Sequence, residues 1–290
     1  MKILITGSNG QLGSEFKALA EGYPLYEFMY TDVDELNITD EACVNHYFAL
    51  YSPDVVINCA AYTAVDKAEN DEETAYLVNA VATGNLARAS SECGAFMVHI
   101  STDYVYDGRN YVPYTETDKI NPLSVYGKSK VAGETAVHQA GGKAVIFRTS
   151  WLYSAFGNNF IKTMMKYGKE RDTLSVVFDQ VGTPTYAHDL AKAILDTLPL
   201  AMTADIIEVY HYSNEGVASW YDFAIAIHHF ANINCTVRPI PTKDYPLPAE
   251  RPFYSVLDKS KIKKKLAIEI PYWRDSVKDC IVRLSEAIDS

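Results

Sequence analysis

The sequence predicts an α/β protein built on a doubly wound parallel β-sheet, followed by a smaller C-terminal α/β domain. The first half of the chain alternates short apolar runs with amphipathic segments, and the apolar runs are nearly continuous rather than interrupted by polar residues. Strands of that kind are buried on both faces, as in a parallel sheet covered by helices on either side. The 290 residues allow one large domain or two modest ones, with a sizeable core.

Strand and helix signals follow each other in a regular order through this first half. Short β-rich apolar runs indicate strands, and longer amphipathic segments indicate helices. The expected strands are residues 2–7, 26–32, 54–61, 96–102 and 143–150. The expected helices are residues 11–22, 40–52, 72–94 and 124–141.

The second half is less regular and holds a denser group of prolines, at positions 239, 241, 246, 248 and 252. A strand is nevertheless expected at residues 205–214, and it should return to the main sheet. We therefore place a soft domain boundary near residue 150.

Composition and charge exclude several classes of function. The net charge of −11 argues against nucleic acid or anionic membranes as partners. No apolar run approaches the roughly 18 residues of a membrane span. The five cysteines are scattered without a C-x-x-C pair, so neither a disulfide framework nor a zinc site is indicated. The opening "MKILITG" enters a strand without a signal-peptide pattern, and we expect a cytoplasmic protein.

Three glycines, Gly7, Gly10 and Gly13, lie between the first expected strand and the first expected helix, in "ITGSNGQLGSE". In such a loop one glycine permits a tight turn, another lets the backbone approach a pyrophosphate, and the third lets the helix pack on the strand. The helix N-terminus adds free N–H groups and a partial positive charge. The loop therefore predicts a Rossmann-type NAD(P)-binding domain over residues 1–150, which leaves residues 151–290 mainly for substrate binding.

Asp32 ends the second expected strand, 19 residues past Gly13. An acid at this place can accept hydrogen bonds from a ribose hydroxyl, which favours NADH, and it should disfavour the extra phosphate of NADPH. The alternative for Asp32 is a turn or helix-capping residue.

A threonine, a tyrosine and a lysine form the candidate catalytic set. Thr102 ends the fourth expected strand, and Tyr126 and Lys130 lie one helical turn apart in "SVYGKSK". Tyr126 would give its phenolic proton to a carbonyl that receives a hydride, and Thr102 would polarise the carbonyl oxygen. Lys130 would lower the pKa of the phenol and hold the nicotinamide ribose.

The glycine loop, Thr102 and the Tyr-x-x-x-Lys pair together resemble the extended short-chain dehydrogenase/reductase superfamily. Further stretches resemble one family within it, the dTDP-4-dehydrorhamnose reductases. They include "NCAAYTAVDKAE" (58–69), "FRTSWLYSAFGNNFIKTM" (147–164) and "PAERPFYSVLD" (248–258). The resemblance implies reduction, by NADPH or NADH, of the 4-keto group of dTDP-4-dehydro-β-L-rhamnose. The product would be dTDP-L-rhamnose, a sugar donor for bacterial surface polysaccharides.

The resemblance also assigns residues. It implies that Thr102, Tyr126 and Lys130 are catalytic and that the last two also contact the cofactor. The further cofactor-binding positions that it implies are Gly10, Gln11 and Leu12 at the pyrophosphate, Asn37 and Ile38 at the adenine, and Ala61, Tyr62 and Thr63 along the cofactor. The substrate-binding positions that it implies are Thr102, Asp103, Trp151, Asn159 and Arg251. For Trp151 a core role is the alternative, and for Arg251 a structural ion pair with Glu250 or Asp258.

Two positions bear on a metal and on the oligomeric state. Some relatives dimerise through Mg²⁺ held by acidic residues, and Glu15 fits one such position. His188 occupies another that is acidic in those relatives, and an imidazole is a poor magnesium ligand. We therefore expect no metal site, and either a monomer or a homodimer.

Two other functions are compatible with this scaffold. One is a different nucleotide-sugar reductase, epimerase or dehydratase. A dehydratase is disfavoured because Asp103 is followed by Tyr104 rather than by a second acid. The other is a non-catalytic regulatory subunit that binds NADP, which the intact Thr102, Tyr126 and Lys130 disfavour.

Overall fold

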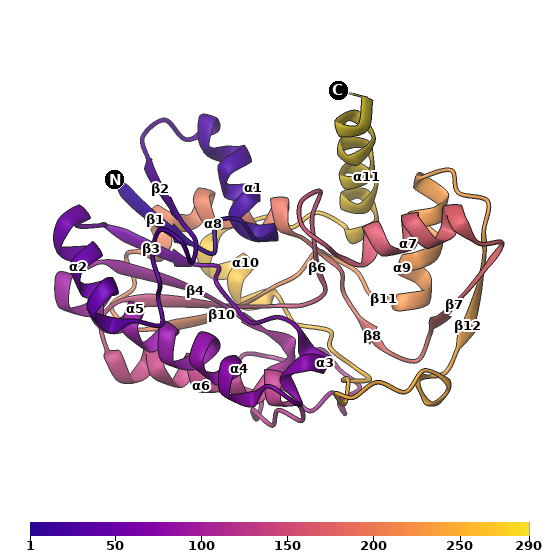
Figure 1. The fold of residues 1–290 in the computed structure, drawn as a ribbon, viewed down its shortest axis with the longest axis horizontal. Helices are drawn as coiled ribbons and strands as arrows, with labels where there is room; N and C mark the ends of the chain where they lie inside the picture. The colour runs from indigo at the N-terminus through magenta and orange to yellow at the C-terminus, as the bar shows by residue number, and fades with distance from the viewer. Residues whose placement is uncertain (290) are drawn as a thin grey trace.

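The computed structural model describes residues 1–289 and is organised around a six-stranded sheet (Figure 1). The strands lie in the order β10-β5-β4-β3-β1-β2, and every neighbouring pair is parallel. Their bounds are β1 (Lys2–Thr6), β2 (Glu27–Thr31), β3 (Val55–Asn58), β4 (Phe96–Thr102), β5 (Ala144–Thr149) and β10 (Glu208–Tyr212). The predicted parallel sheet is therefore confirmed, and the strand expected at 205–214 is β10, at its edge.

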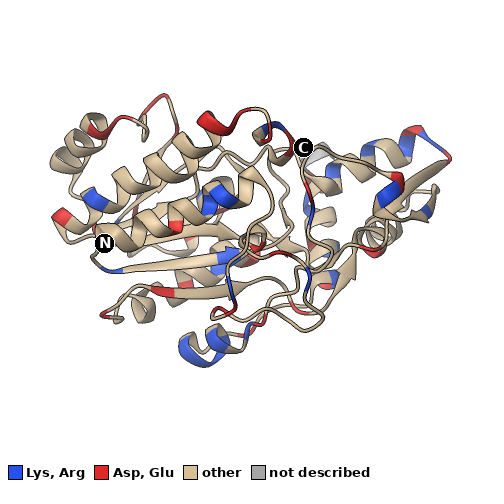
Figure 2. Cartoon of the chain, turned by 90° about the horizontal axis from the view of Figure 1, so that it is seen from below, with Lys and Arg blue, Asp and Glu red and all other residues tan. Residues whose placement is uncertain are grey.

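Helices cover both faces of this sheet, as a doubly wound fold requires (Figure 1). One face carries α1 (Gln11–Leu19), α8 (Ala187–Ala201) and α10 (Ser260–Leu266), whose apolar residues join one buried cluster with the strands. The other face carries α2 (Glu41–Tyr51), α5 (Ala82–Cys93) and α6 (Val125–Ala140), which form a second cluster. Most charged residues lie on helices and loops, and the strands are largely uncharged (Figure 2).

The expected elements differ from the observed ones mainly at their ends. The strand expected at 54–61 stops at Asn58, whose side-chain oxygen accepts a hydrogen bond from the backbone N–H of Ala60 and so favours a turn. The helix expected at 11–22 ends in a short 3₁₀ turn, Ala20–Gly22. The helix expected at 72–94 divides into α4 (Glu72–Tyr76), a π-helical turn (Leu77–Val81) and α5.

The second half of the chain adds a smaller lobe beside the sheet. It contains the parallel pair β7 (Thr173–Val177) and β12 (Thr236–Ile240), four strands of two residues each, and three helices. These further elements are β6 (Leu152–Tyr153), β8 (Val181–Gly182), β9 (Thr185–Tyr186), β11 (Ala218–Ser219), α7 (Phe160–Glu170), α9 (Trp220–Phe230) and α11 (Trp273–Asp289). A separate apolar cluster fills this lobe. Because α8, β10 and α10 pack with the main sheet, the chain crosses between the two lobes more than once.

A buried polar network joins α6 to the sheet. Glu134 accepts hydrogen bonds from the guanidinium of Arg148 on β5, at 2.6 and 2.9 Å, and from the hydroxyl of Ser101 on β4. Arg148 also donates to the hydroxyl of Tyr106, which in turn lies 2.7 Å from Nε2 of His211 on β10. The network therefore links α6 with three neighbouring strands of the sheet.

No helix within residues 1–289 is both long enough and apolar enough to cross a membrane.

The π-helical turn packs closely against α6, and this contact gives a stability prediction. A Cβ atom added at Gly133 would lie 2.2 Å from the backbone oxygen of Asn79, which the π-helical turn places there. We expect Gly133→Ala to lower the free energy of unfolding by about 1–3 kcal/mol, as overpacked cores do. Chemical denaturation measures the change.

Gly22→Ala is the matched control, because an added Cβ there meets nothing within 4 Å. Equal stability of the two variants would contradict the close contact between Gly133 and the π-helical turn.

Candidate active site

Two adjoining cavities lie at the carboxyl edge of the main sheet, where ligands bind in folds of this kind. The first has a volume of about 450 Å³ and is lined by the glycine loop, Asp32 and residues 36–39. The second, of about 560 Å³, is lined by Thr102, Tyr126 and Lys130 and by residues of the second lobe. Gly10, Cys59 and Ala61 line both cavities. The cavities therefore join into one trough along the carboxyl ends of the strands, which is where a dinucleotide would bind.

The glycine loop fits the pyrophosphate of such a ligand. Gly7 has a φ of +64°, which favours glycine, and a Cβ at Gly13 would lie 2.5 Å from the backbone oxygen of Gly7. Gly10 precedes α1 as its N-cap residue and supplies no capping side chain. The first N–H groups of α1 therefore remain available to an anion, which the helix dipole also attracts.

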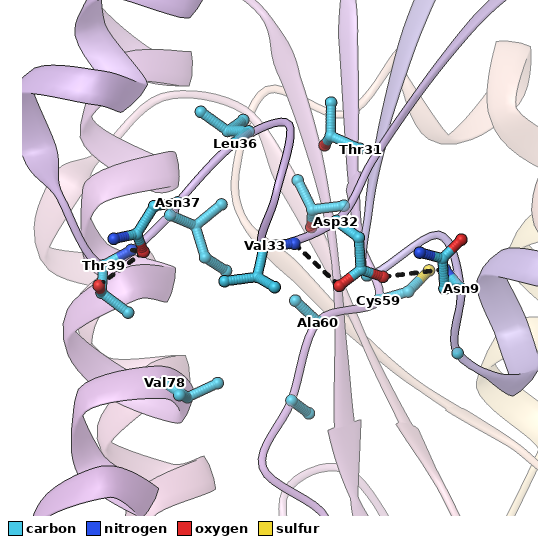
Figure 3. A pocket seen from close by; sticks show the side chains of 15 residues that line it. Asn9, Thr31, Asp32, Val33, Leu36, Asn37, Thr39, Cys59, Ala60 and Val78 are labelled. Carbon is cyan, nitrogen blue, oxygen red and sulfur yellow. Dashed lines mark hydrogen bonds between the residues drawn. The ribbon is translucent and has the colours of Figure 1, made fainter.

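Asp32 closes the first cavity with its carboxylate (Figure 3). Its two oxygens accept hydrogen bonds from the backbone N–H groups of Asn9, at 3.0 Å, and Val33, at 2.9 Å. The carboxylate of Glu35 accepts from the N–H of Asp32 itself, at 2.8 Å. Two negative charges thus lie at the end of β2, where they suit the hydroxyls of a ribose better than a phosphate.

The far end of the first cavity is suited to a planar ring. Leu36, Ile38 and Val78 supply apolar surface there, as Figure 3 shows for the labelled Leu36 and Val78. The side-chain oxygen of Asn37 accepts hydrogen bonds from the backbone and hydroxyl of Thr39, which holds this loop in a tight turn. Asn37 and Ile38 both line the cavity, and their contact with an adenine stays a prediction.

The segment that follows β3 runs along the trough. Ala61 lines both cavities and Thr63 lines the second. Tyr62 differs from this expectation: its hydroxyl bonds the carboxylate of Asp71, and its side chain is not among the residues that line either cavity. Its backbone N–H and oxygen are both held by the amide of Asn79, so Tyr62 fixes the path of the segment instead.

Thr102, Tyr126 and Lys130 come together at the second cavity. Thr102 is the last residue of β4, and α6 begins just before Tyr126, where the hydroxyl of Ser124 caps the helix by accepting from the N–H of Gly127. Lys130 is almost completely buried, and its ammonium donates a 2.6 Å hydrogen bond to the backbone oxygen of Ile100.

The expected effect of Lys130 on the phenol differs from what the structure shows. Burial raises the pKa of Tyr126, with the Thr102 hydroxyl opposing this shift and the charge of Asp103 adding to it. Burial also lowers the pKa of Lys130 to about 8, against the opposing charge of Glu134. Because burial raises its pKa, Tyr126 keeps its proton near neutral pH, which is the form that a proton donor requires. The ammonium of Lys130 interacts with Ile100 and Glu134.

Asp103 is the second carboxylate of the site. One of its oxygens accepts a hydrogen bond from the Thr102 hydroxyl, at 3.0 Å, and the other is buried without a partner among residues 1–289. Buried polar atoms nearly always have a partner, so this oxygen fits a contact with a bound ligand. Burial raises the pKa of Asp103 to about 6, while the hydrogen bond from the Thr102 hydroxyl lowers it.

Trp151 has the geometry of a site residue rather than of a core aromatic. Its φ of +48° is uncommon for a bulky residue, and its ring stacks on that of Trp220 with centroids 3.7 Å apart. Both rings line the second cavity. The sequence reasoning missed Trp220, since no motif surrounds it and only the folded second lobe brings it to the site.

Asn159 and Arg251 connect the second lobe to the first. Asn159 caps α7 and donates to the side-chain oxygen of Gln11 in the glycine loop, at 3.0 Å. Arg251 pairs with Asp66 on α3 (Val65–Ala68), rather than with Glu250 or Asp258. Glu250 instead lies 3.6 Å from Arg109. No pattern in the sequence pairs Asp66 with Arg251, because the two residues are far apart along the chain.

Glu15 is fully buried and bound within the chain. Its carboxylate accepts hydrogen bonds from Arg283, at 2.6 Å, and Ser154, and it lies 3.2 Å from Nδ1 of His188. In the part of the chain that the structure describes, no group of three or more His, Cys, Asp or Glu residues could hold a metal ion. Arg283 supplies the positive charge that balances this carboxylate.

The trough, the glycine loop and the Thr-Tyr-Lys set define an oxidoreductase of the short-chain dehydrogenase/reductase class that uses a nicotinamide cofactor. The family model described as the RmlD substrate binding domain matches residues 1–286. The chain belongs to this family, that of the dTDP-4-dehydrorhamnose reductases.

Individual relatives are similar over nearly the whole chain. The dTDP-4-dehydrorhamnose reductase of Aggregatibacter actinomycetemcomitans is 40% identical, over 96% of this chain and 97% of that protein. The crystal structure of a dTDP-4-dehydrorhamnose reductase from Clostridium acetobutylicum matches with a TM-score of 0.94 and 45% identity, over 98% of this chain and all of that one (100%). The dTDP-4-dehydrorhamnose reductase of Bacillus anthracis, solved in complex with NADP, matches with a TM-score of 0.92 and 38% identity, over 97% and 99% of the two chains.

The raised pKa of Asp103 makes a prediction about stability and pH. A carboxyl whose pKa is about 6 in the folded chain and 3.8 when unfolded adds stability below about pH 3.8, and this stability is lost as the pH rises through 6. The asparagine in Asp103→Asn does not titrate. We therefore expect the free energy of unfolding of this variant to rise by up to about 3 kcal/mol relative to wild type as the pH goes from 4 to 8. Urea denaturation at several pH values measures the difference. A difference between the two proteins that stays constant with pH would contradict the shift.

Proposed function

We propose that this chain reduces the 4-keto group of dTDP-4-dehydro-β-L-rhamnose to give dTDP-L-rhamnose, with NADH or NADPH as the cofactor. The observation that carries the proposal is the position of Thr102, Tyr126 and Lys130. They lie in a cavity that continues on one side into the glycine-loop trough and on the other into the second lobe. Membership in the reductase family supports the choice of substrate.

The substrate fits the second cavity and its neighbour. A third cavity of about 400 Å³, lined by residues of α7, β7 and the segment around Tyr245, shares Trp220 and Arg251 with the second. In this proposal the sugar lies beside Tyr126, the diphosphate reaches Arg251, and the nucleoside enters the third cavity. A guanidinium suits a diphosphate because its planar fork can bind two oxygens at once.

The residues of the chain then divide the work of the reaction. The bound reduced nicotinamide supplies the hydride. Tyr126, kept protonated by its burial, donates its proton to the ketone oxygen as negative charge develops there. The hydroxyl of Thr102, which turns from Asp103 to the ketone, polarises the same oxygen. Lys130 lines the same cavity and holds the nicotinamide ribose. Trp151 and Trp220 limit the access of water to the second cavity.

In this proposal residues 1–150 bind the dinucleotide and residues 151–290 mainly bind the substrate, although α8, β10 and α10 pack with the main sheet. In this proposal the protein acts in the cytoplasm, as a monomer or a homodimer. The product would serve as a donor for surface polysaccharide.

The proton donor gives a direct test of the reaction. With dTDP-4-dehydrorhamnose and reduced cofactor, we expect wild type to oxidise the cofactor, which is measured as a loss of nicotinamide absorbance. We expect kcat of Tyr126→Phe to be lower by at least about 100-fold. Tyr76→Phe is the matched control, since Tyr76 lies on α4 and lines neither of the two cavities.

Unchanged turnover in Tyr126→Phe would be consistent with the proposed reaction but would show that Tyr126 is not the proton donor. An absence of turnover with either cofactor, despite tight cofactor binding, would favour a regulatory subunit or another sugar nucleotide.

The two carboxylates at the end of β2 predict a cofactor preference. We expect wild type to bind NADH more tightly than NADPH, and Asp32→Ala to shift the ratio of the two dissociation constants toward NADPH by about tenfold or more. Cofactor fluorescence titration gives both constants without turnover. Circular dichroism checks that the variant is folded. An unchanged ratio in the folded variant would show that Asp32 does not contact the ribose.

A further inference from the structure

Arg251 already holds two partners within the chain. One end of its guanidinium donates to the carboxylate of Asp66, at 2.6 Å, and the other donates to the hydroxyl of Tyr104, at 2.9 Å. Arg251 lines both the second and the third cavity, and Asp66 lines the third. The ion pair therefore lies where the two cavities meet.

Asp66 presents to Arg251 the kind of group that a diphosphate would present. Carboxylate and phosphate oxygens bind the same N–H fork with similar geometry, so the two compete for it. The side chains of Arg251 and Asp66 are 21% and 34% exposed, which leaves the pair open to exchange. A diphosphate that takes the N–H group facing Asp66 must first break this ion pair.

The neighbours of the pair allow such an exchange without a large movement. Tyr104 lies edge-on to the ring of Tyr126, and its hydroxyl accepts a hydrogen bond from the other end of the guanidinium. The backbone N–H of Ala249 also donates to Asp66, at 3.3 Å, so the carboxylate keeps one partner when Arg251 leaves.

We propose that Asp66 competes with the substrate diphosphate for Arg251 and so sets the affinity for the sugar nucleotide. This inference rests on the proposed function, because it assumes a diphosphate at Arg251. In this arrangement Asp66 weakens binding of the substrate and of the product alike. It thereby favours release of the product after reduction.

The experiment measures the dissociation constant of dTDP alone by isothermal titration calorimetry. We expect Asp66→Asn to bind dTDP about fivefold more tightly than wild type, which corresponds to about 1 kcal/mol for a partly exposed ion pair. The asparagine keeps the shape of the side chain and can still accept from Ala249. A gain of affinity is a result that structural damage would not produce, and an unchanged dissociation constant for NADH in the same sample confirms the fold.

Two comparisons identify the cause of a gain. Glu250→Gln removes an equal charge from the residue next to Arg251, and it should change the affinity for dTDP by less than about twofold. In an Arg251→Met background, Asp66→Asn should give no gain. A fivefold gain that persists in that background would overturn the competition, since Asp66 would then act on dTDP through its charge alone.

The remaining outcomes separate the inference from the function on which it rests. Binding of dTDP to wild type without any gain in Asp66→Asn, or in the smaller Asp66→Ser, would overturn the inference and leave the reductase standing. Failure of wild type to bind dTDP would overturn both.

Discussion

The buried ion pair between Glu134 and Arg148 holds the helix that carries Tyr126 and Lys130 against the central sheet. Glu134 lies on the same face of α6 as these two residues, at successive spacings of four, and both of its oxygens are bound by Arg148. Separating a buried pair typically costs about 3–5 kcal/mol, so α6 can neither rotate nor slide without a large loss of stability. The position of the phenol relative to Thr102, and with it the chemistry of the site, depends on this pair.

The second lobe reaches the site through the first helix of the fold. On α1, Gln11 receives a hydrogen bond from Asn159, and Glu15 receives one each from Arg283 and Ser154. The same helix directs its N-terminal N–H groups at the trough. The element that faces the cofactor phosphates is therefore also the element on which the second lobe rests, so a shift of either lobe changes the shape of both cavities.

The parts of the protein that could be predicted from sequence depend on local patterns. The strands of the main sheet, the glycine loop and the pair of Tyr126 and Lys130 each follow from residues within a few positions of one another. The π-helical turn and the ion pair of Asp66 with Arg251 could not be predicted, since they depend on packing between distant segments. The expected lowering of the pKa of Tyr126 fails for the same reason, because the burial that raises this pKa arises only in the folded chain.

The stacked indoles of Trp151 and Trp220 give the molecule a built-in optical signal. The chain has three tryptophans, and two of them line the cavity that faces Tyr126, while Trp273 is buried in the core of the second lobe. The emission of the stacked pair therefore depends on whatever lies against it in that cavity. Intrinsic fluorescence can follow arrival and departure of a sugar nucleotide in real time, with no label attached and no catalysis required.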